Sequence, residues 1–202
     1  DIDLFVLDDG WFGHRDADNS SLGDWYDDLR KLPDGLSSLS GKIHALGLKF
    51  GLWVEPEMIS VDSDLYREHP DWCIHAGGYP RIEARNQLVL DMSRQDVRDR
   101  TVEVICDAMR RGNVDYIKWD MNRNISCWGS AQLDAAHQRE LGHRYILGVY
   151  DVMNRITGAF PEVLFESCAG GGGRFDLAMM AYMPQAWCSD DTDAWMRCRI
   201  QY

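Results

Sequence analysis

An apolar run that passes directly into charged residues carries the clearest chemical signal in the sequence. Residues 114–117 are mostly apolar, and Lys118, Asp120 and Asn122 follow at alternate positions. Alternate residues of a strand share a face, so these three side chains are expected to point the same way. An ammonium fixed beside a carboxylate keeps the carboxylate ionised. The pattern predicts a carboxylate nucleophile at the end of a strand, and the alternative for this motif alone is a surface salt bridge.

A second acidic cluster follows Trp187, in the sequence Ser-Asp-Asp-Thr-Asp of residues 189–193. Neighbouring like charges and an apolar ring both raise a carboxyl pKa, so Asp190 is predicted to be the proton donor. The alternative is a solvated helix N-terminus, where acids are common and Ser189 or Thr192 would serve as the cap. Two carboxyl groups flanking one bond are the minimum for hydrolysing a glycoside. Asp120 and Asp190 therefore form a candidate catalytic pair.

Several aromatic and glycine residues near the expected strand ends could contact a sugar. Indole rings pack on the apolar face of a sugar ring, although burial in the core is an equal alternative for each of Trp11, Trp25, Trp53 and Trp187. The glycines at 170–173 allow a close backbone approach to a ligand. They lack the Gly-Lys-Ser/Thr of a phosphate-binding loop. Asp8 and Asp9, which precede Gly10, form either a simple turn or a pair of acceptors for vicinal hydroxyls.

The candidate residues can form one site only if the strands that carry them end close together. Apolar runs predict strands at 2–7, 49–54, 114–119, 162–165 and 185–188, with a further short strand at 88–90 and a turn at 77–78. Helical patterns occupy 36–46, 137–157 and 175–181, and Ser93-x-x-Asp96 resembles a capping box that opens another helix ending near 111. Strands alternating with helices, without hairpin signals, predict a parallel sheet. Nearly continuous apolar strands indicate a sheet buried on both faces.

The ends of all five expected strands carry an acid, which distinguishes two architectures. An open doubly wound sheet gathers its functional residues at one switch point. A (β/α)₈ TIM barrel instead builds its site from the ends of many strands. The sequence therefore predicts the α/β class and a barrel, of which five units are only a part. The chain starts at Asp1 without an initiator methionine and stops at Tyr202 without a sequence signal that ends a domain. Residues 1–202 are therefore expected to be the central part of a catalytic barrel domain.

Composition excludes several function classes. The 202 residues carry a formal charge of −12, which argues against nucleic acid or an anionic membrane surface as a partner. No apolar run approaches the ~18 residues of a membrane span, and no signal peptide is visible. The six cysteines show no metal-like spacing, and the histidines are dispersed, so no metal site is expected. Scattered cysteines in a core-forming chain indicate reduced thiols and a cytoplasmic location.

With these motifs in view, the chain resembles glycoside hydrolase family 36, the α-galactosidases of clan D. The most specific segments are Gly-Leu-Trp-Val-Glu-Pro-Glu-Met (51–58), Tyr-Ile-Lys-Trp-Asp-Met-Asn-Arg (116–123), Phe-Glu-Ser-Cys-Ala-Gly-Gly-Gly-Gly-Arg-Phe-Asp (165–176) and Trp-Cys-Ser-Asp-Asp-Thr-Asp-Ala (187–194). Further matches lie at 4–13, 21–25, 85–91 and 143–148. Together they span the chain in the family's order.

The resemblance implies a retaining α-galactosidase that acts without a cofactor on terminal α-linked galactose, with Asp120 as nucleophile and Asp190 as acid/base. Asp8 and Asp9 look like the pair that holds the galactose 4- and 6-hydroxyls. The remaining sugar pocket would comprise Trp53, Arg85, Lys118, Asn122, Cys168, Gly171 and Trp187. The resemblance further suggests barrel strands two to six, with flanking β-rich domains and the other strands outside this segment, and a homo-oligomer, specifically a tetramer.

Three alternatives remain open at the level of the sequence. A metal-dependent barrel of enolase type could hold Mg²⁺ on Glu55, Asp120 and Glu166, with Lys118 as base. A sugar-binding protein without catalysis is a second alternative, although binding alone would need neither Asp120 nor Asp190. A preference for α-N-acetylgalactosamine is the third. Aglycone preference and competing transglycosylation are not readable from the residues.

Overall fold

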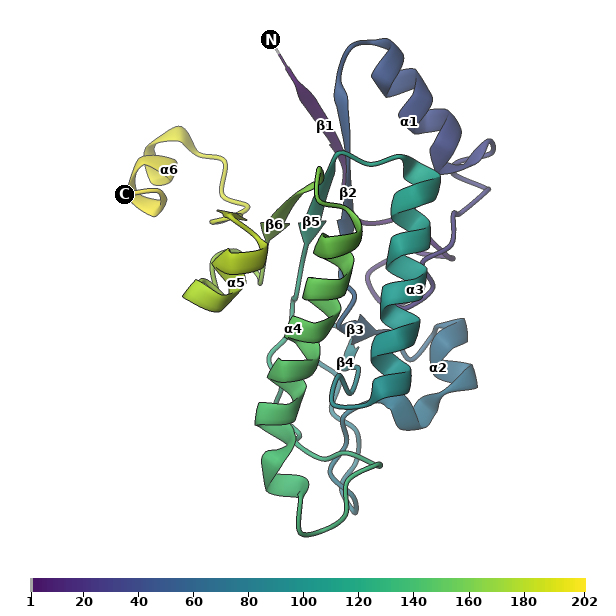
Figure 1. The fold of residues 1–202 in the computed structure, drawn as a ribbon, viewed down its shortest axis with the longest axis vertical. Coiled ribbons are helices and arrows are strands. Elements are labelled where there is room, and N and C mark those ends of the chain that lie inside the picture. Colours follow the sequence, from purple (N-terminus) through teal and green to yellow (C-terminus); the bar gives the residue numbers. More distant parts are fainter. Residues whose placement is uncertain (1) are drawn as a thin grey trace.

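The computed structural model of the protein describes residues 2–202, and a five-stranded parallel sheet forms its centre (Figure 1). Its strands are β1 (Leu4–Leu7), β2 (Lys49–Val54), β5 (Tyr116–Trp119), β6 (Leu164–Ser167) and β7 (Gln185–Ala186). They lie side by side in chain order, and each pairing is parallel. A doubly wound sheet reverses its order at a switch point, whereas sequential order is how a (β/α)₈ barrel is built. The structure confirms the predicted α/β class and is that of a partial barrel.

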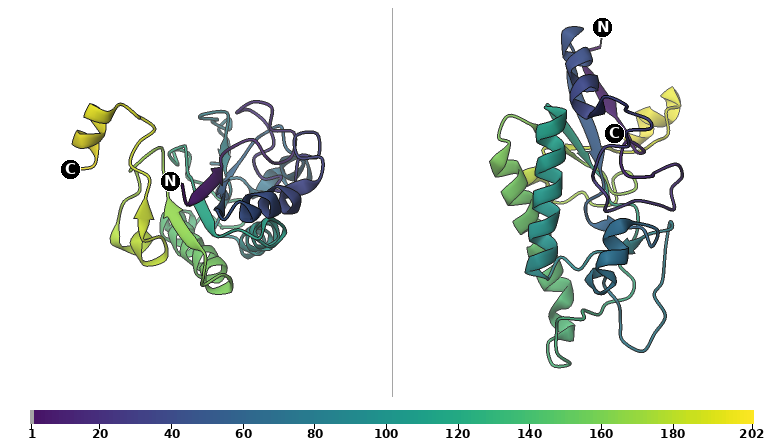
Figure 2. Two further views of the ribbon diagram at one scale, coloured as in Figure 1. Left: turned by 90° about the horizontal axis from the view of Figure 1, so that it is seen from above. Right: turned by 90° about the vertical axis from the view of Figure 1, so that its right-hand side faces the viewer.

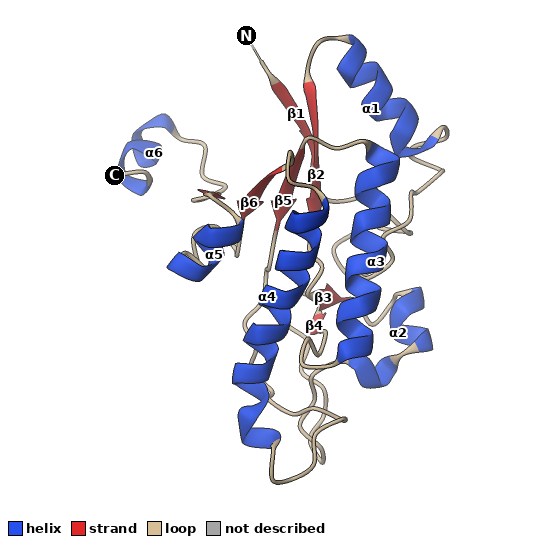
Figure 3. Ribbon diagram, in the orientation of Figure 1, coloured by secondary structure: helices blue, strands red, loops and turns tan. Residues whose placement is uncertain are grey.

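Helices cover one face of this sheet in an arc (Figure 2). The three long ones are α1 (Gly35–Ala45), α3 (Gln95–Gly112) and α4 (Leu141–Ala159). The helix α3 packs between α1 and α4, and α5 (Leu177–Tyr182) packs against α4. The last helix, α6 (Ala194–Ile200), lies beyond β7, away from the long helices (Figure 3). This arrangement leaves the other face of the sheet free of long helices.

The two faces of the sheet differ in chemistry. The face under the helices is apolar, although Phe5 on the edge strand is 43% exposed. Its fully buried side chains, at most 2% exposed, are Phe50, Leu52, Val54, Ile117, Trp119 and Phe165. The opposite face carries polar groups at paired positions, since Trp53 pairs with Lys118 and Lys118 pairs with Glu166. The opposite face is also largely buried, since Trp53 and Glu166 are at most 4% exposed. The predicted burial on both faces is therefore confirmed there too, whereas the predicted apolar character holds only for the helix-covered face. The polar face is the one that can hold a site.

Smaller elements lie on the long excursion between β2 and α3. The strands β3 (Met58–Ile59) and β4 (Leu88–Val89) form a separate antiparallel pair. Between them lie α2 (Asp64–Glu68) and a 3₁₀ helix at Pro70–Trp72. A second 3₁₀ helix, Gln138–Glu140, precedes α4. The strand expected at 88–90 is thus present, but it pairs outside the main sheet.

The predicted capping box before α3 is wrong. Helix α3 begins at Gln95, and its N-cap is Arg94, whose side chain makes no capping hydrogen bond. The Ser93 hydroxyl donates instead to Asp91 Oδ1, and Arg94 pairs with Asp96. The acid that was expected to complete the box therefore binds an arginine, and the Ser93 hydroxyl binds Asp91 instead of capping the helix. No helix among residues 2–202 is both long and apolar enough to cross a membrane.

Candidate active site

Asp120 lies just beyond the end of β5 and is surrounded by hydrogen-bond donors. Its Oδ2 accepts from Asn122 Nδ2 at 2.8 Å and from Trp53 Nε1 at 3.1 Å. Its Oδ1 accepts from the backbone N–H of Met121 at 2.8 Å. The Cys168 thiol also hydrogen-bonds to the carboxylate. The Asp120 residue is 6% exposed, so these donors replace most of the water that an ionised carboxylate requires.

This environment favours the ionised form of Asp120. Burial acts to raise its pKa, but hydrogen bonds from Cys168, Asn122 and Trp53 outweigh burial and hold the pKa below its usual value. The ionised state of Asp120 is therefore as predicted, but its main cause is different. From the sequence pattern we expected Lys118 to keep Asp120 ionised, whereas in the structure neutral hydrogen-bond donors do so.

Lys118 pairs across the sheet with an acid at the end of β1. Its ammonium lies 2.9 Å from Asp8 Oδ2, and this hydrogen bond, together with the charges of Asp8 and Asp120, outweighs burial and raises the Lys118 pKa. The neighbouring Asp9 accepts three hydrogen bonds from Arg15, at 2.9, 3.2 and 2.8 Å. Asp8 and Asp9 are thus not a simple turn. Each of them is fixed by a cation, and Asp8 lies on the side of β1 that faces the end of β5.

Trp187 connects the second predicted carboxyl group to this cluster. Its Nε1 donates to Asp190 Oδ1 at 2.8 Å, and the Lys118 ammonium lies 4.8 Å from the centre of its ring. Asp190 itself is exposed to solvent. The expected alternative for the acidic cluster is also partly correct, because Asp193 caps α6 by accepting from the Met196 N–H. The cap is Asp193 rather than Ser189 or Thr192, which leaves Asp190 outside the cap.

The tryptophans separate into two groups. Trp11, Trp25 and Trp53 are at most 5% exposed and pack around Phe12, with ring centres 4.4–6.3 Å apart. Of these three, only Trp53 donates to Asp120. Trp11 and Trp25 are core residues, so the prediction of a sugar contact does not apply to them. Trp187 is partly exposed, as a ring that stacks on a ligand must be.

The glycine-rich loop after β6 completes the surroundings of Asp120. Gly171 has a φ of +89°, and a Cβ there would lie 2.9 Å from the carbonyl oxygen of Cys188, so only glycine fits. This loop and the residues after β5 enclose a cavity of about 520 Å³, lined among others by Arg85, Asn122 and Gly170. Arg85 reaches Asn122 Oδ1 at 3.5 Å. The predicted site residues therefore gather at one end of the sheet. Trp53 and Lys118 lie on β2 and β5, Arg85 precedes β4, and the others lie in the loops after β1, β5, β6 and β7.

Two buried acids after β2, Glu55 and Glu57, were not predicted as residues of the sugar site, and Glu55 was named only in the magnesium alternative. Glu55 is fully buried and accepts from the Asn122 backbone N–H and from Gln87 Nε2. Glu57 pairs with Arg174 at 2.8 Å and accepts from Tyr145. Their position at a strand end was the only signal in the sequence. Their partners are distant along the chain, so neither contact could be read from local spacing.

The three acids proposed for a magnesium site do not converge. Glu55 and Asp120 lie near one another, since the charge of Asp120 acts to raise the pKa of Glu55. Glu166 is buried below them and hydrogen-bonds to Gln185 Nε2 and to the Tyr116 hydroxyl. Across residues 2–202, no three side chains of histidine, cysteine, aspartate or glutamate are grouped as metal ligands. The geometry does not favour the enolase-type alternative.

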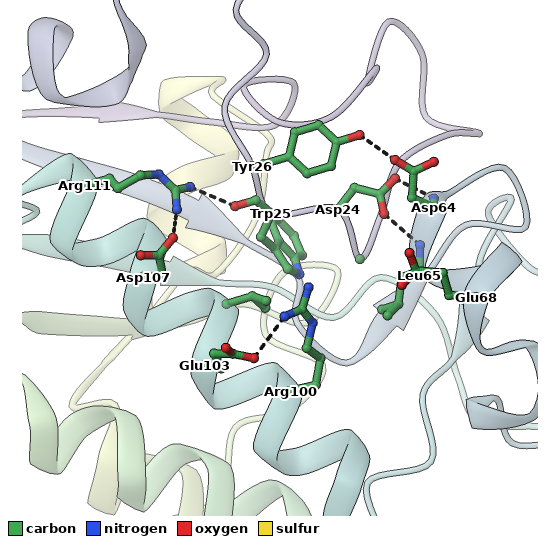
Figure 4. A pocket seen from close by; sticks show the side chains of 12 residues that line it. Asp24, Trp25, Tyr26, Asp64, Leu65, Glu68, Arg100, Glu103, Asp107 and Arg111 are labelled. Carbon is green, nitrogen blue, oxygen red and sulfur yellow. Dashed lines mark hydrogen bonds and ion pairs between the residues drawn. The ribbon is translucent and has the colours of Figure 1, made fainter.

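A second cavity, of about 330 Å³, lies between α2, α3 and the loop at residues 22–26 (Figure 4). Its charged side chains largely pair with each other: Arg111 binds Asp107, and Arg100 binds Glu103. Of the residues considered for the sugar site, only Trp25 lines this cavity, and Trp25 is a core residue. It is separate from the site around Asp120.

Comparison with known proteins decides the family. The sequence profile described as Melibiase matches residues 1–202. The chain belongs to the Melibiase family. Among curated family relatives, α-galactosidase AgaA of Geobacillus stearothermophilus is 58% identical over 201 residues, and Mel36A of Lactobacillus acidophilus is 52% identical. All of this chain is covered in both cases, but it spans only 28% of each relative's length.

Solved structures of α-galactosidases share the fold. A crystal structure of a variant of Geobacillus stearothermophilus AgaA with raffinose superposes with a TM-score of 0.97, covering 100% of this chain and 28% of that one, at 58% identity. The Thermus thermophilus α-galactosidase, solved with stachyose, has a TM-score of 0.68 at 27% identity, covering 94% of this chain and 37% of that one. The resemblance noted in the sequence is therefore confirmed.

Proposed function

We propose that the intact protein is a retaining α-galactosidase that hydrolyses terminal α-linked galactose from raffinose-type oligosaccharides. The observation that carries the proposal is that Asp120, in a chain of the Melibiase family, has a buried carboxylate that accepts hydrogen bonds from Trp53 and Asn122. A carboxylate held ionised at neutral pH can attack the anomeric carbon directly. The raffinose complex of the AgaA variant supports the substrate class.

In the first step, Asp120 forms a bond to the anomeric carbon while the bond to the leaving oxygen breaks. Asp190 gives its proton to that oxygen, and its exposed position near Trp187 suits a group that must meet the aglycone. In the second step, Asp190 takes a proton from water, which attacks the anomeric carbon and releases Asp120. Two inversions give net retention.

The other site residues would bind the galactose. The carboxylates of Asp8 and Asp9 are fixed by Lys118 and Arg15, so they can accept hydrogen bonds from the 4- and 6-hydroxyls without moving. The partly exposed Trp187 ring offers an apolar surface to the sugar. Arg85 and Asn122 line the adjoining cavity. Cys168 and Gly171 would limit the room beside the nucleophile. Residues 1–202 would then be the central part of a catalytic barrel.

The proposal is tested by NMR on the intact protein with nitrophenyl α-galactoside. Retention predicts that α-galactose is the first product, before mutarotation. The rate on the N-acetylgalactosamine analogue, measured beside it, separates the two substrate preferences. EDTA is expected to leave the rate unchanged. First-formed β-galactose would contradict the retaining mechanism, and loss of activity in EDTA that added Mg²⁺ restores would favour a metal-dependent enzyme.

A further inference from the structure

Glu55 is linked to the proposed nucleophile through one intervening residue. It lies directly after β2 and is fully buried. Its Oε1 accepts from the backbone N–H of Asn122, whose side chain donates to Asp120 Oδ2 at 2.8 Å. A shift of the Glu55 carboxyl group would therefore move Asn122, and with it a donor that stabilises Asp120. Glu55 thus has the geometry of a positioning residue.

The charges around Glu55 do not balance two buried carboxylates, one on Asp120 and one on Glu55. The groups that act on it are Asp120 after β5 and Arg15 after β1. The Arg15 guanidinium is already engaged by Asp9 and makes no contact with Glu55. Burial and the charge of Asp120 raise the pKa of Glu55 to about 7, against partial opposition from the Asn122 hydrogen bonds. Two neighbouring carboxyl groups in such a site tend to keep one proton between them.

Gln87 provides a partner for either protonation state of Glu55. In the structure its Nε2 donates to Glu55 Oε2 at 3.1 Å, which suits an ionised Glu55. Its Oε1 is buried and has no hydrogen-bond partner. Rotation of the amide would bring Oε1 to Glu55, where it could accept a proton from the neutral acid. Gln87 Oε1 would thus have a hydrogen-bond partner when Glu55 is neutral and none when Glu55 is ionised, as in the structure.

We propose, on the basis of the proposed function, that Glu55 holds a proton beside Asp120 in the free enzyme and releases it when the galactosyl-enzyme forms. In that step the bond from Asp120 to the anomeric carbon forms, and the bond to the leaving group breaks. The charge of Asp120 is lost in the ester. Glu55 then ionises, and its proton passes to solvent. Hydrolysis of the ester restores the charge of Asp120, and Glu55 takes up a proton again.

The test uses α-galactosyl fluoride and the Asp190→Asn variant of the intact protein. Fluoride leaves without an acid, and the missing base allows the galactosyl-enzyme to accumulate. Attack of a carboxylate on the fluoride releases no proton by itself, so any proton in the burst comes from an ionising side chain. The Cys168 thiol, whose pKa is raised to about 12, and the Lys118 ammonium stay protonated. An indicator dye reports protons, and mass spectrometry reports adduct on Asp120.

We expect up to one proton per adduct, with the largest release at pH values just below about 7, where Glu55 is protonated in the free enzyme. Glu55→Gln added to the variant should abolish the release, because a glutamine can keep both contacts but has no proton to lose. Glu162→Gln, the same change at an exposed site, should leave it intact. The pH dependence of release in Asp190→Asn alone tests the proposal even if Glu55→Gln does not fold.

Two results would overturn the proposal in distinguishable ways. Adduct on Asp120 without proton release, or with equal release in Glu55→Gln, would refute the role of Glu55 and leave the proposed function standing. Absence of any adduct on Asp120 would refute both.

Discussion

Replacing Trp53 with phenylalanine should raise the pKa of Asp120 and shift the acid limb of activity. Trp53 donates one of the hydrogen bonds that keep the carboxylate ionised, at 3.1 Å to Oδ2. Phenylalanine keeps an aromatic ring in the same cluster but has no donor. Without that donor the ionised form is less stable, so Asp120 takes up a proton at a higher pH. The acid limb of kcat/KM should therefore move to higher pH.

The size of the shift follows from the contact. A hydrogen bond to a charged group contributes about 1.5–3 kcal/mol. The distance exceeds the ~2.7–2.9 Å typical of charge-assisted contacts, so we take the lower end, about 1.5 kcal/mol. That free energy corresponds to about one pKa unit. The shorter contact of Asn122, at 2.8 Å, predicts a larger shift for Asn122→Ala.

The assay is the pH profile of kcat/KM on nitrophenyl α-galactoside. Trp11→Phe is the matched control, because Trp11 lies in the same aromatic cluster and donates to the Trp53 carbonyl rather than to Asp120. Both variants should lose rate or stability through packing, but only Trp53→Phe should shift the limb. An unshifted limb in Trp53→Phe, or an equal shift in Trp11→Phe, would refute this account of the Asp120 environment.

Three further predictions concern the rest of the site. Asp190→Ala should lower the rate on raffinose by ~10²–10⁴-fold, the usual contribution of general acid catalysis, with a smaller loss and a lowered KM on dinitrophenyl galactoside as the galactosyl-enzyme accumulates; equal losses on both substrates without a burst of dinitrophenol would show that Asp190 only binds sugar. The carboxyl groups of Asp120 and Asp190 should lie about 5–5.5 Å apart in a crystal structure of the intact protein with galactose, whereas a separation beyond roughly 6.5 Å would favour inversion. Gly171→Ala should lower the melting temperature and the activity, since its φ of +89° and the Cys188 carbonyl 2.9 Å away exclude a side chain; wild-type values for both would refute the close packing of this loop.

The strands of the main sheet were predictable because each is an apolar run that ends in polar residues. The prediction for β2 matches the structure at both ends, and those for β1 and β5 begin two residues early. The prediction for β6 lies two residues early at both ends, and that for β7 ends two residues late. Patterns of this kind depend on burial under the helices, which acts along the whole strand. The pair β3–β4 was only half anticipated, because strands of two residues have no period to detect.

The placement of side chains was less predictable than that of strands. Alternation correctly placed Lys118 and Asp120 at one end of the sheet, but it could not show that Lys118 pairs with Asp8, 110 residues away. The sequence also could not separate Trp11, which is buried, from Trp187, which is accessible. Both differences arise from contacts between distant segments, and local spacing contains no information on such contacts.

The role of Asp120 as nucleophile is the central claim, and Asp120→Gly in the intact protein tests it most directly. Removing the carboxylate should abolish hydrolysis of nitrophenyl α-galactoside, because no covalent intermediate can form. Azide can then occupy the vacated space and attack the anomeric carbon, so added azide should restore slow release of nitrophenol and yield β-galactosyl azide, identified by NMR. Hydrolysis by Asp120→Gly at a rate close to that of the wild type, without azide, would contradict the account.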